Sequence, residues 1–275
     1  MNVIKRIAVR FFKERFYDQS AQAAYYLLLS TLPFLLVVLS LASLLPLSPN
    51  AFMDLLQPYI PEAAYPLIEE NVRVITKGDF GPLLPFSLIA AFWVSSMAVQ
   101  SLARSLDEAI GVVNRMSYFR RLVHDLGVTL LFMLIIPLSL LLPIVDQFLH
   151  VWISHTETIQ LWRGWVYVWP IIRWGFGSLF LFGFFLAFFK LLPSDYVRFR
   201  EVLPGALFTT MAWQGGSILF NRYAAFVNYS MLYGQLSGIV LLILWFFLTA
   251  VILLVAGLLN AELRHARSVK ERRML

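Results

Sequence analysis

The 275-residue sequence contains no cysteine, and only 14% of its residues are charged. The absence of cysteine excludes disulfide frameworks, thiolate zinc sites, iron–sulfur clusters and cysteine nucleophiles. The shortage of charge excludes an ordinary soluble domain, in which about a quarter of the residues are charged. Instead, 60% of the residues are hydrophobic and 16% are aromatic, which is more apolar surface than one compact core can hide. The composition therefore predicts a polytopic membrane protein.

Long runs with little or no charge occur six times along the chain. At about 1.5 Å per residue, a helix of about 20 residues crosses the roughly 30 Å hydrocarbon core of a bilayer. The predicted spans are residues 23–47, 82–103, 122–145, 165–192, 202–223 and 236–260. These runs are continuously apolar and do not alternate with polar residues, which excludes a membrane β-barrel. We predict an all-α protein whose six-helix transmembrane domain occupies residues 21–262.

Lysine and arginine are concentrated in alternate connections between these spans. Most of the 22 basic residues precede the first span, follow the last, or lie between spans two and three and spans four and five. Because cytoplasmic loops retain positive charge during insertion, both termini are predicted to be cytoplasmic. This distribution explains the net charge of +6 without nucleic-acid binding, and it favours contact with anionic lipid head groups. We therefore predict membrane lipids, and no nucleic acid, as partners.

Three segments flank or interrupt the spans. Residues 1–20 contain apolar and basic residues at helical spacing, which predicts an amphipathic helix in the cytoplasmic interface. Residues 48–81 form the longest connection, are acidic and rich in proline, and are predicted to cap the outer face with short helices. Residues 263–275 form a basic cytoplasmic tail.

Polar residues recur in three predicted spans at spacings that place them on one helical face. They are Gln22, Tyr26 and Ser30 in the first span, Ser96 and Gln100 in the second, and Gln214, Asn221 and Arg222 in the fifth. Such side chains either join neighbouring membrane helices or line a polar cavity. In the cavity interpretation, Arg222 is the partner of an anion, whereas its alternative is to extend to the outer interface.

Glycines and charged residues within the spans carry information on packing. Close approach of helices is predicted at four glycines: Gly175, Gly183, Gly215 and Gly216. Arg104 is spaced for an ion pair with Asp107 or Glu108 on the same helix. Asp195 and Glu262 are predicted to be structural ion partners of nearby arginine and lysine side chains.

No catalytic constellation is visible in the sequence. The closest two of the four histidines, His150 and His155, are five residues apart, and no HExxH, GxSxG, P-loop or Rossmann glycine motif occurs. We therefore predict that the protein is not an enzyme and holds no metal and no cofactor.

Three segments resemble the YihY/BrkB family of bacterial inner-membrane proteins: AQAAYYLLLSTLPFLLVV, PGALFTTMAWQGGSILFNRY and NYSMLYGQLSGIVLLILWFFLTAVILLVAGLLNAEL. The resemblance covers nearly the whole chain and implies six transmembrane helices in the cytoplasmic membrane. Members of this family have carried the label ribonuclease BN, but hydrolysis of RNA needs activated water and a phosphate-binding site, and no such cluster occurs here. Family-level suggestions of transport or export of lipid-like molecules fit the polar faces better.

Two functions of different classes follow. The leading hypothesis is a transporter or lipid-translocating protein that handles an amphiphilic or anionic molecule through a polar cavity among the first, second and fifth spans. The alternative is a non-transporting scaffold that binds lipids or partner proteins, and a ribonuclease is disfavoured. The expected substrate is a small molecule or a lipid, and the sequence favours no particular oligomeric state.

Overall fold

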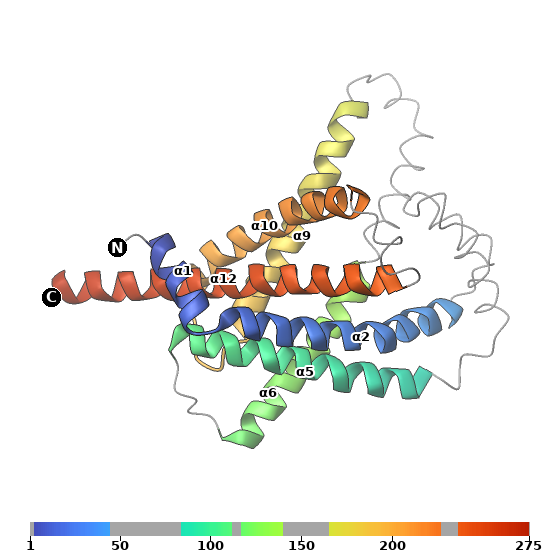
Figure 1. Cartoon of the computed structure of the whole chain (residues 1–275), viewed down its shortest axis with the longest axis horizontal. Coiled ribbons are helices and arrows are strands. Elements are labelled where there is room, and N and C mark those ends of the chain that lie inside the picture. The colour runs from blue at the N-terminus through green and yellow to red at the C-terminus, as the bar shows by residue number, and fades with distance from the viewer. Residues whose placement is uncertain (1–2, 45–83, 112–116, 140–164, 227–235, 275) are drawn as a thin grey trace.

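The structure, a computed structural model, describes residues 3–44, 84–111, 117–139, 165–226 and 236–274, and all regular structure in these ranges is helical. The helices are α1 (Val3–Lys13), α2 (Phe16–Leu44), α5 (Leu84–Ile110), α6 (Tyr118–Ser139), α9 (Trp165–Leu191), α10 (Phe199–Phe226) and α12 (Ser237–Met274) (Figure 1). The all-α prediction is confirmed, and each predicted span lies largely on one of the six long helices. The predicted outer cap at residues 48–81 lies outside the described residues.

Three of these helices are long and apolar enough to cross a membrane. The qualifying segments are Pro85–Ile110, Trp174–Leu191 and Ser237–Arg267, on α5, α9 and α12. Large apolar side chains on the outer surface of α5, such as Phe86, Ile89 and Trp93, are mostly exposed. A continuous exposed apolar surface requires lipid or a partner to cover it. That α2, α6 and α10 also cross the membrane stays a prediction. The predicted division of the chain at residues 20 and 262 stays a prediction as well.

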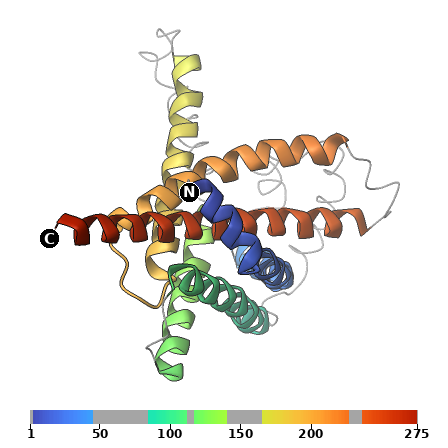
Figure 2. The same cartoon turned by 60° about the vertical axis from the view of Figure 1, so that its left-hand side comes forward.

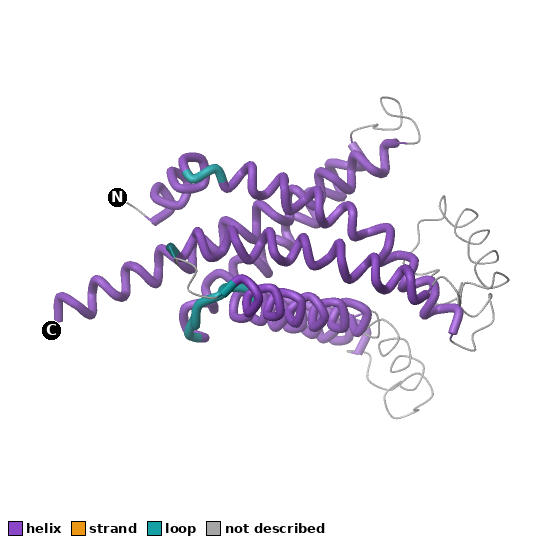
Figure 3. Tube along the Cα trace, turned by 90° about the horizontal axis from the view of Figure 1, so that it is seen from below, coloured by secondary structure: helices purple, strands orange, loops and turns teal. Residues whose placement is uncertain are grey.

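The helix axes of the bundle run in two main directions. α2, α5, α10 and α12 run beside one another, whereas α6 and α9 cross them at a steep angle (Figures 1 and 2). α12 contacts α1, α2, α5 and α10, so it is the central element of the bundle. The described loops are short and lie at the same end of the bundle as both chain ends (Figure 3). This end is called the loop end below.

Several fully buried side chains lie at the loop end. α2 and α10 begin there and α5 and α9 end there, which brings Phe16, Val202, Leu106 and Leu192 together in one region, each with 1% exposure or less. Leu254 and Leu258 of α12 are likewise fully buried. These side chains belong to one contiguous cluster. The helices are therefore joined by an apolar core near their loop ends.

Two glycines allow α12 to approach its neighbours closely. The backbone N–H of Gly205, on α10, donates a hydrogen bond of 2.7 Å to Asn260 Oδ1 on α12. A Cβ atom on Gly205 would lie only 2.6 Å from Asn260 Cγ, and one on Gly257 would collide with the Leu106 side chain of α5. These contacts fix the axial position of α12 relative to α10 and α5.

Three of the four glycines predicted to mark close approaches do not do so. No described atom lies within 4 Å of a Cβ atom built on Gly175, Gly183 or Gly215, and the corresponding distances at Gly216 are ordinary van der Waals contacts. For these three the prediction is wrong, because a glycine matters where a bulky side chain of another helix faces it, as Ile252 and Leu248 of α12 face Gly216. That pairing depends on the tertiary register, which spacing within one helix does not reveal.

Candidate functional site

A cavity of about 550 Å³ lies between α2, α5, α6, α9, α10 and α12. Its volume falls in the range of about 300–1,000 Å³ that is common for ligand pockets. Its lining is mainly aliphatic and aromatic, and none of the described residues that form it is charged. The aromatic side chains of the lining are Phe132, Phe180, Phe184, Phe185, Phe188, Trp213, Trp245 and Phe246. The site is therefore suited to hydrocarbon.

Ring contacts connect the helices that form the cavity wall. Phe132 of α6 lies 5.3 Å from Phe184 of α9, measured between ring centroids. Phe185 of α9 lies 6.5 Å from Trp213 of α10, which lies 5.5 Å from Trp245 of α12. Aromatic pairs at these separations add attraction beyond the area that they bury. The rings thus give the cavity a continuous wall across four helices.

Hydroxyl groups supply the polar part of the lining, and most of them bond to their own helix. The hydroxyl-bearing residues are Ser30, Thr31, Ser95, Thr129 and Thr249. Ser30 and Thr31 both donate to the carbonyl of Leu27, at 2.8 and 2.9 Å. Thr129 donates to the carbonyl of Asp125 at 2.7 Å. These protons are directed at the backbone, so they add little polarity to the cavity.

The residues predicted to line a polar cavity are dispersed. Ser30 lines the apolar cavity, whereas Ser96 is buried and donates to the carbonyl of Trp93 at 2.7 Å. Gln214 of α10 donates to Ser178 Oγ of α9 at 2.8 Å, which is helix packing. The exposed members are Gln22, Asn221 and Arg222, and the half-buried members besides Ser30 and Gln214 are Tyr26 and Gln100. A separate polar cavity lined by these residues stays a prediction.

The cavity differs from the predicted one in two respects. It is apolar, and six helices contribute to its wall in place of the three that were expected. The physical reason is that a hydroxyl or amide in a membrane helix finds a backbone carbonyl or a facing side chain, and is then no longer available to a cavity.

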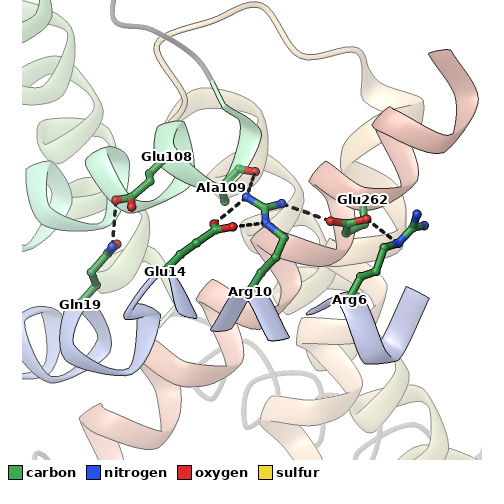
Figure 4. A network of polar contacts seen from close by, with 7 residues as sticks. All are labelled: Arg6, Arg10, Glu14, Gln19, Glu108, Ala109 and Glu262. Carbon is green, nitrogen blue, oxygen red and sulfur yellow. Dashed lines mark hydrogen bonds and ion pairs between the residues drawn. The ribbon is translucent and has the colours of Figure 1, made fainter. Parts of the chain in front are cut away.

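An ionic network at the loop end attaches α1 to the bundle (Figure 4). Glu262 of α12 is only 8% exposed and lies 3.0 Å from Arg6 Nε and 3.4 Å from Arg10 Nη1. Arg10 also donates to both carboxylate oxygens of Glu14, and to the Ala109 carbonyl in the last turn of α5 at 2.9 Å. The hydrogen bond to Glu14 and the charges of Glu14 and Glu262 raise the pKa of Arg10, although its burial opposes them. A permanent cation thus joins α1, α5 and α12.

Glu262→Ala is expected to lower the free energy of unfolding by about 1.5–3 kcal/mol, the usual contribution of hydrogen bonds to charged groups. It should also release α1, because Arg6 and Arg10 lose their carboxylate on α12. The chain has no native cysteine, so spin labels at Val9→Cys and Ala266→Cys report the distance between α1 and α12. Glu14→Ala is the matched control, since it removes an Arg10 partner that lies in the turn after α1 and not on α12. An unchanged distance in Glu262→Ala would contradict the attachment.

A second ionic cluster is buried between α5, α6 and the loop after α9. Arg121 Nη1 lies 2.7 Å from Asp107 Oδ2, and Arg121 Nε lies 3.6 Å from Asp125 Oδ2. Ser194 donates to Asp107 from its backbone N–H at 2.8 Å and from its hydroxyl at 2.7 Å. Both aspartates are 4% exposed. One arginine therefore balances two buried carboxylates.

These contacts decide the predictions made for charged residues. The predicted pairing of Arg104 within its helix is wrong, because Asp107 binds Arg121 and Glu108 accepts a hydrogen bond from Gln19 at 2.9 Å. The predicted roles of Asp195 and Glu262 are confirmed, since Asp195 lies 3.5 Å from Arg264 and Glu262 binds arginines of α1. No group of three His, Asp or Glu side chains that could hold a metal ion occurs among the residues that the structure describes.

Long apolar helices, exposed apolar side chains and a hydrocarbon-lined cavity together define a helical membrane protein. The chain belongs to the family described as virulence factor BrkB, whose sequence profile matches residues 7–274. The resemblance noted from the sequence is thereby confirmed.

The similar proteins come from several bacteria. The chain is 31% identical over 272 residues to a Bacillus subtilis protein named ribonuclease-like protein YfkH, with 98% of each chain covered. It is 24% identical to a UPF0761 membrane protein of Aliivibrio salmonicida, covering 92% of this chain and 80% of the relative. It is 22% identical to a UPF0761 membrane protein of Coxiella burnetii, and the match covers 91% of this chain and 89% of the relative. No solved structure gives a significant match.

Proposed function

We propose that this protein binds lipid-like amphiphiles and moves them across or within the bacterial cytoplasmic membrane. In this proposal the hydrocarbon part of the substrate enters the aromatic cavity, and the head group stays outside it. The observation that carries the proposal is the cavity itself, which is about 550 Å³ in volume and has no charged side chain among its described lining residues.

The lining decides which part of an amphiphile fits. A charged group in the centre of a bilayer costs about 2.5 kcal/mol or more by insertion scales, and the described lining offers no charge to offset that cost. A hydrocarbon chain in the bilayer is already out of water, so burial from water gives it little further driving force. Its gain comes from dispersion contacts with the rings of the wall. Such binding is weak, which suits a protein that must release what it carries.

The proposal includes a topology in which the chain crosses the membrane six times. Both termini and the loop end then lie in the cytoplasm, with α1 as an amphipathic helix at that interface. The concentration of basic residues at this end supports the orientation. α2, α6 and α10 contain 29, 22 and 28 residues, and about 20 suffice for a crossing.

Reconstituted vesicles with a fluorescent phospholipid test this function. The purified protein is expected to speed exchange of the lipid between leaflets relative to vesicles without protein. Leu181→Trp, which fills the cavity from α9, should reduce the rate to that of empty vesicles. Leu179→Trp is the matched control, because Leu179 lies on the same helix but is 64% exposed and outside the lining. Equal rates for the wild type and Leu181→Trp would refute the proposal.

The name of the Bacillus subtilis relative makes RNA cleavage a second candidate. The same purified protein, with thermal unfolding as evidence of its fold, is incubated with labelled RNA and divalent metal. Under the proposed function, the RNA stays intact while lipid exchange proceeds. Metal-dependent cleavage with no lipid exchange would favour the ribonuclease instead, and absence of both activities would favour the scaffold.

A further inference from the structure

The helices that line the cavity can be followed in a ring, and one boundary in this ring differs from the others. Among the described residues, α2 packs along α5, α5 along α6, α9 along α10, α10 along α12, and α12 along α2. The backbones of α6 and α9, in contrast, scarcely approach each other. This boundary between α6 and α9 is called the seam below. Its closure depends on side chains.

Three aromatic rings close the seam. Phe132 of α6 lies 5.3 Å from Phe184 and 6.0 Å from Phe188, both on α9, measured between ring centroids. All three residues line the cavity, and Phe132 and Phe188 are only 7% and 5% exposed. A side chain can change its rotamer without breaking backbone hydrogen bonds, whereas the packed boundaries part only if whole helices move. The seam is therefore the boundary that opens at the lowest cost.

The outer side of the seam is suited to hydrocarbon. Leu130 and Leu134 of α6 are 53% and 64% exposed and lie outside the lining, whereas the neighbouring Ile135 lines the cavity. One helix thus separates the cavity from an exposed apolar surface. No charged residue occurs in residues 128–135 of α6 or 180–188 of α9. A hydrocarbon chain crosses such a boundary without leaving apolar surroundings, whereas a charged head group would lose its water there.

We infer that the hydrocarbon chain of the substrate passes between the bilayer and the cavity through the seam, and that the Phe132 side chain is the gate. The chain passes when the Phe132 ring turns away from Phe184 and Phe188, and the head group stays at the membrane interface meanwhile. This inference rests on the proposed function, because it gives the route by which the same cavity is filled and emptied.

Exchange of the fluorescent phospholipid in reconstituted vesicles tests the gate. Phe132→Ala removes both ring contacts that close the seam, so it is expected to speed exchange about two- to tenfold over the wild type. Phe132→Leu should fold with less disturbance and give a smaller acceleration. Phe132→Trp keeps a large ring in the seam and should slow exchange. Thermal unfolding shows which variants are folded, and a wild-type rate in folded Phe132→Ala or Phe132→Leu would overturn the inference.

Phe185→Ala is the matched comparison, because it removes the same side chain from the wall of the same cavity. The Phe185 ring contacts Trp213 of α10, at a boundary where the helices pack along each other. Phe185→Ala therefore reports what enlargement of the cavity does to the rate, and Phe132→Ala should exceed it at least about twofold. Equal acceleration in the two variants would show that cavity size sets the rate, which would overturn the inference.

A distance measurement follows the seam itself. The chain has no native cysteine, so spin labels at Leu134→Cys on α6 and Leu179→Cys on α9, both 64% exposed, report the separation of these helices. With Phe132 in place, we expect one narrow distance distribution. Phe132→Ala should broaden it toward longer distances, because the seam opens more often. An unchanged distribution in Phe132→Ala would overturn the inference.

The outcomes also separate this inference from the proposed function. If Leu181→Trp stops exchange but Phe132→Ala exchanges lipid at the wild-type rate, the cavity carries lipid by another route, and only the gate is refuted. If Leu181→Trp exchanges lipid at the wild-type rate, the cavity is not used, and both proposals fail.

Discussion

Arg121→Ala is expected to lower the free energy of unfolding by about 3–5 kcal/mol, the usual cost of removing one partner from a buried ion pair. Arg121 is the cation that contacts both Asp107 and Asp125, and the side chains of these aspartates are only 6% and 5% exposed. Its loss leaves two carboxylates buried, with Ser194 as donor to Asp107 and His124 beside Asp125. Reversible unfolding in mixed SDS and detergent micelles measures the change.

The neighbouring arginine is the control for this prediction. Arg120 is exposed, so Arg120→Ala should change the free energy of unfolding by less than about 0.5 kcal/mol. Adding Asp107→Asn and Asp125→Asn to Arg121→Ala should restore part of the loss, because both carboxylate charges are then absent. A loss below about 1 kcal/mol in Arg121→Ala would show that the cluster behaves like an exposed ion pair.

The positions of the long helices could be predicted from the sequence because few backbone conformations are stable in the hydrocarbon of a membrane. A backbone group without a partner is costly in lipid, so a long apolar run must form its hydrogen bonds locally, as a helix. The run at residues 236–260 accordingly lies on α12, and the run at 202–223 lies on α10. The helix ends differ from the predicted limits, because α12 continues as helix through the basic tail.

The cavity could not be predicted, since its wall consists of residues that carry no distinguishing signal. The lining includes Phe132, Phe184 and Trp213. The sequence pattern of an aromatic residue in a span does not distinguish whether the residue faces lipid, another helix or a void. Polar residues stand out in a membrane helix, yet Ser96 and Gln214 bond within the protein. Which face of each helix meets the cavity depends on the rotation of the helices against one another.

Charged residues at the ends of helices were predictable only in part. Glu262 and Asp195 lie in regions dense in arginine, so almost any packing supplies a partner. Asp107 had a candidate partner at i−3 on its own helix, but Arg121 of α6 and Ser194 bind it instead. An ion pair along one exposed helix face contributes only about 0.2–0.5 kcal/mol, so a buried tertiary contact readily replaces it.

Gly205→Ala is expected to lower the free energy of unfolding by about 2–4 kcal/mol, through overpacking and the loss of one hydrogen bond. The added methyl group would lie 2.6 Å from Asn260 Cγ, and Asn260 is itself 7% exposed, so its side chain has little room to move. Any shift of Asn260 also breaks the 2.7 Å bond that its Oδ1 accepts from the Gly205 N–H. Reversible unfolding in mixed SDS and detergent micelles again measures the change in the free energy of unfolding.

Gly215→Ala on the same helix should instead raise the free energy of unfolding. No described atom lies within 4 Å of a Cβ atom built there, and alanine is favoured over glycine in a helix interior by about 0.5–1 kcal/mol. The clash at Gly205 should be relieved by Asn260→Ala, so the double variant should lose less than the sum of the two single losses. Strict additivity would show that Gly205 and Asn260 do not contact each other, and equal destabilisation at Gly205 and Gly215 would show that packing of Gly205 against α12 does not set the cost.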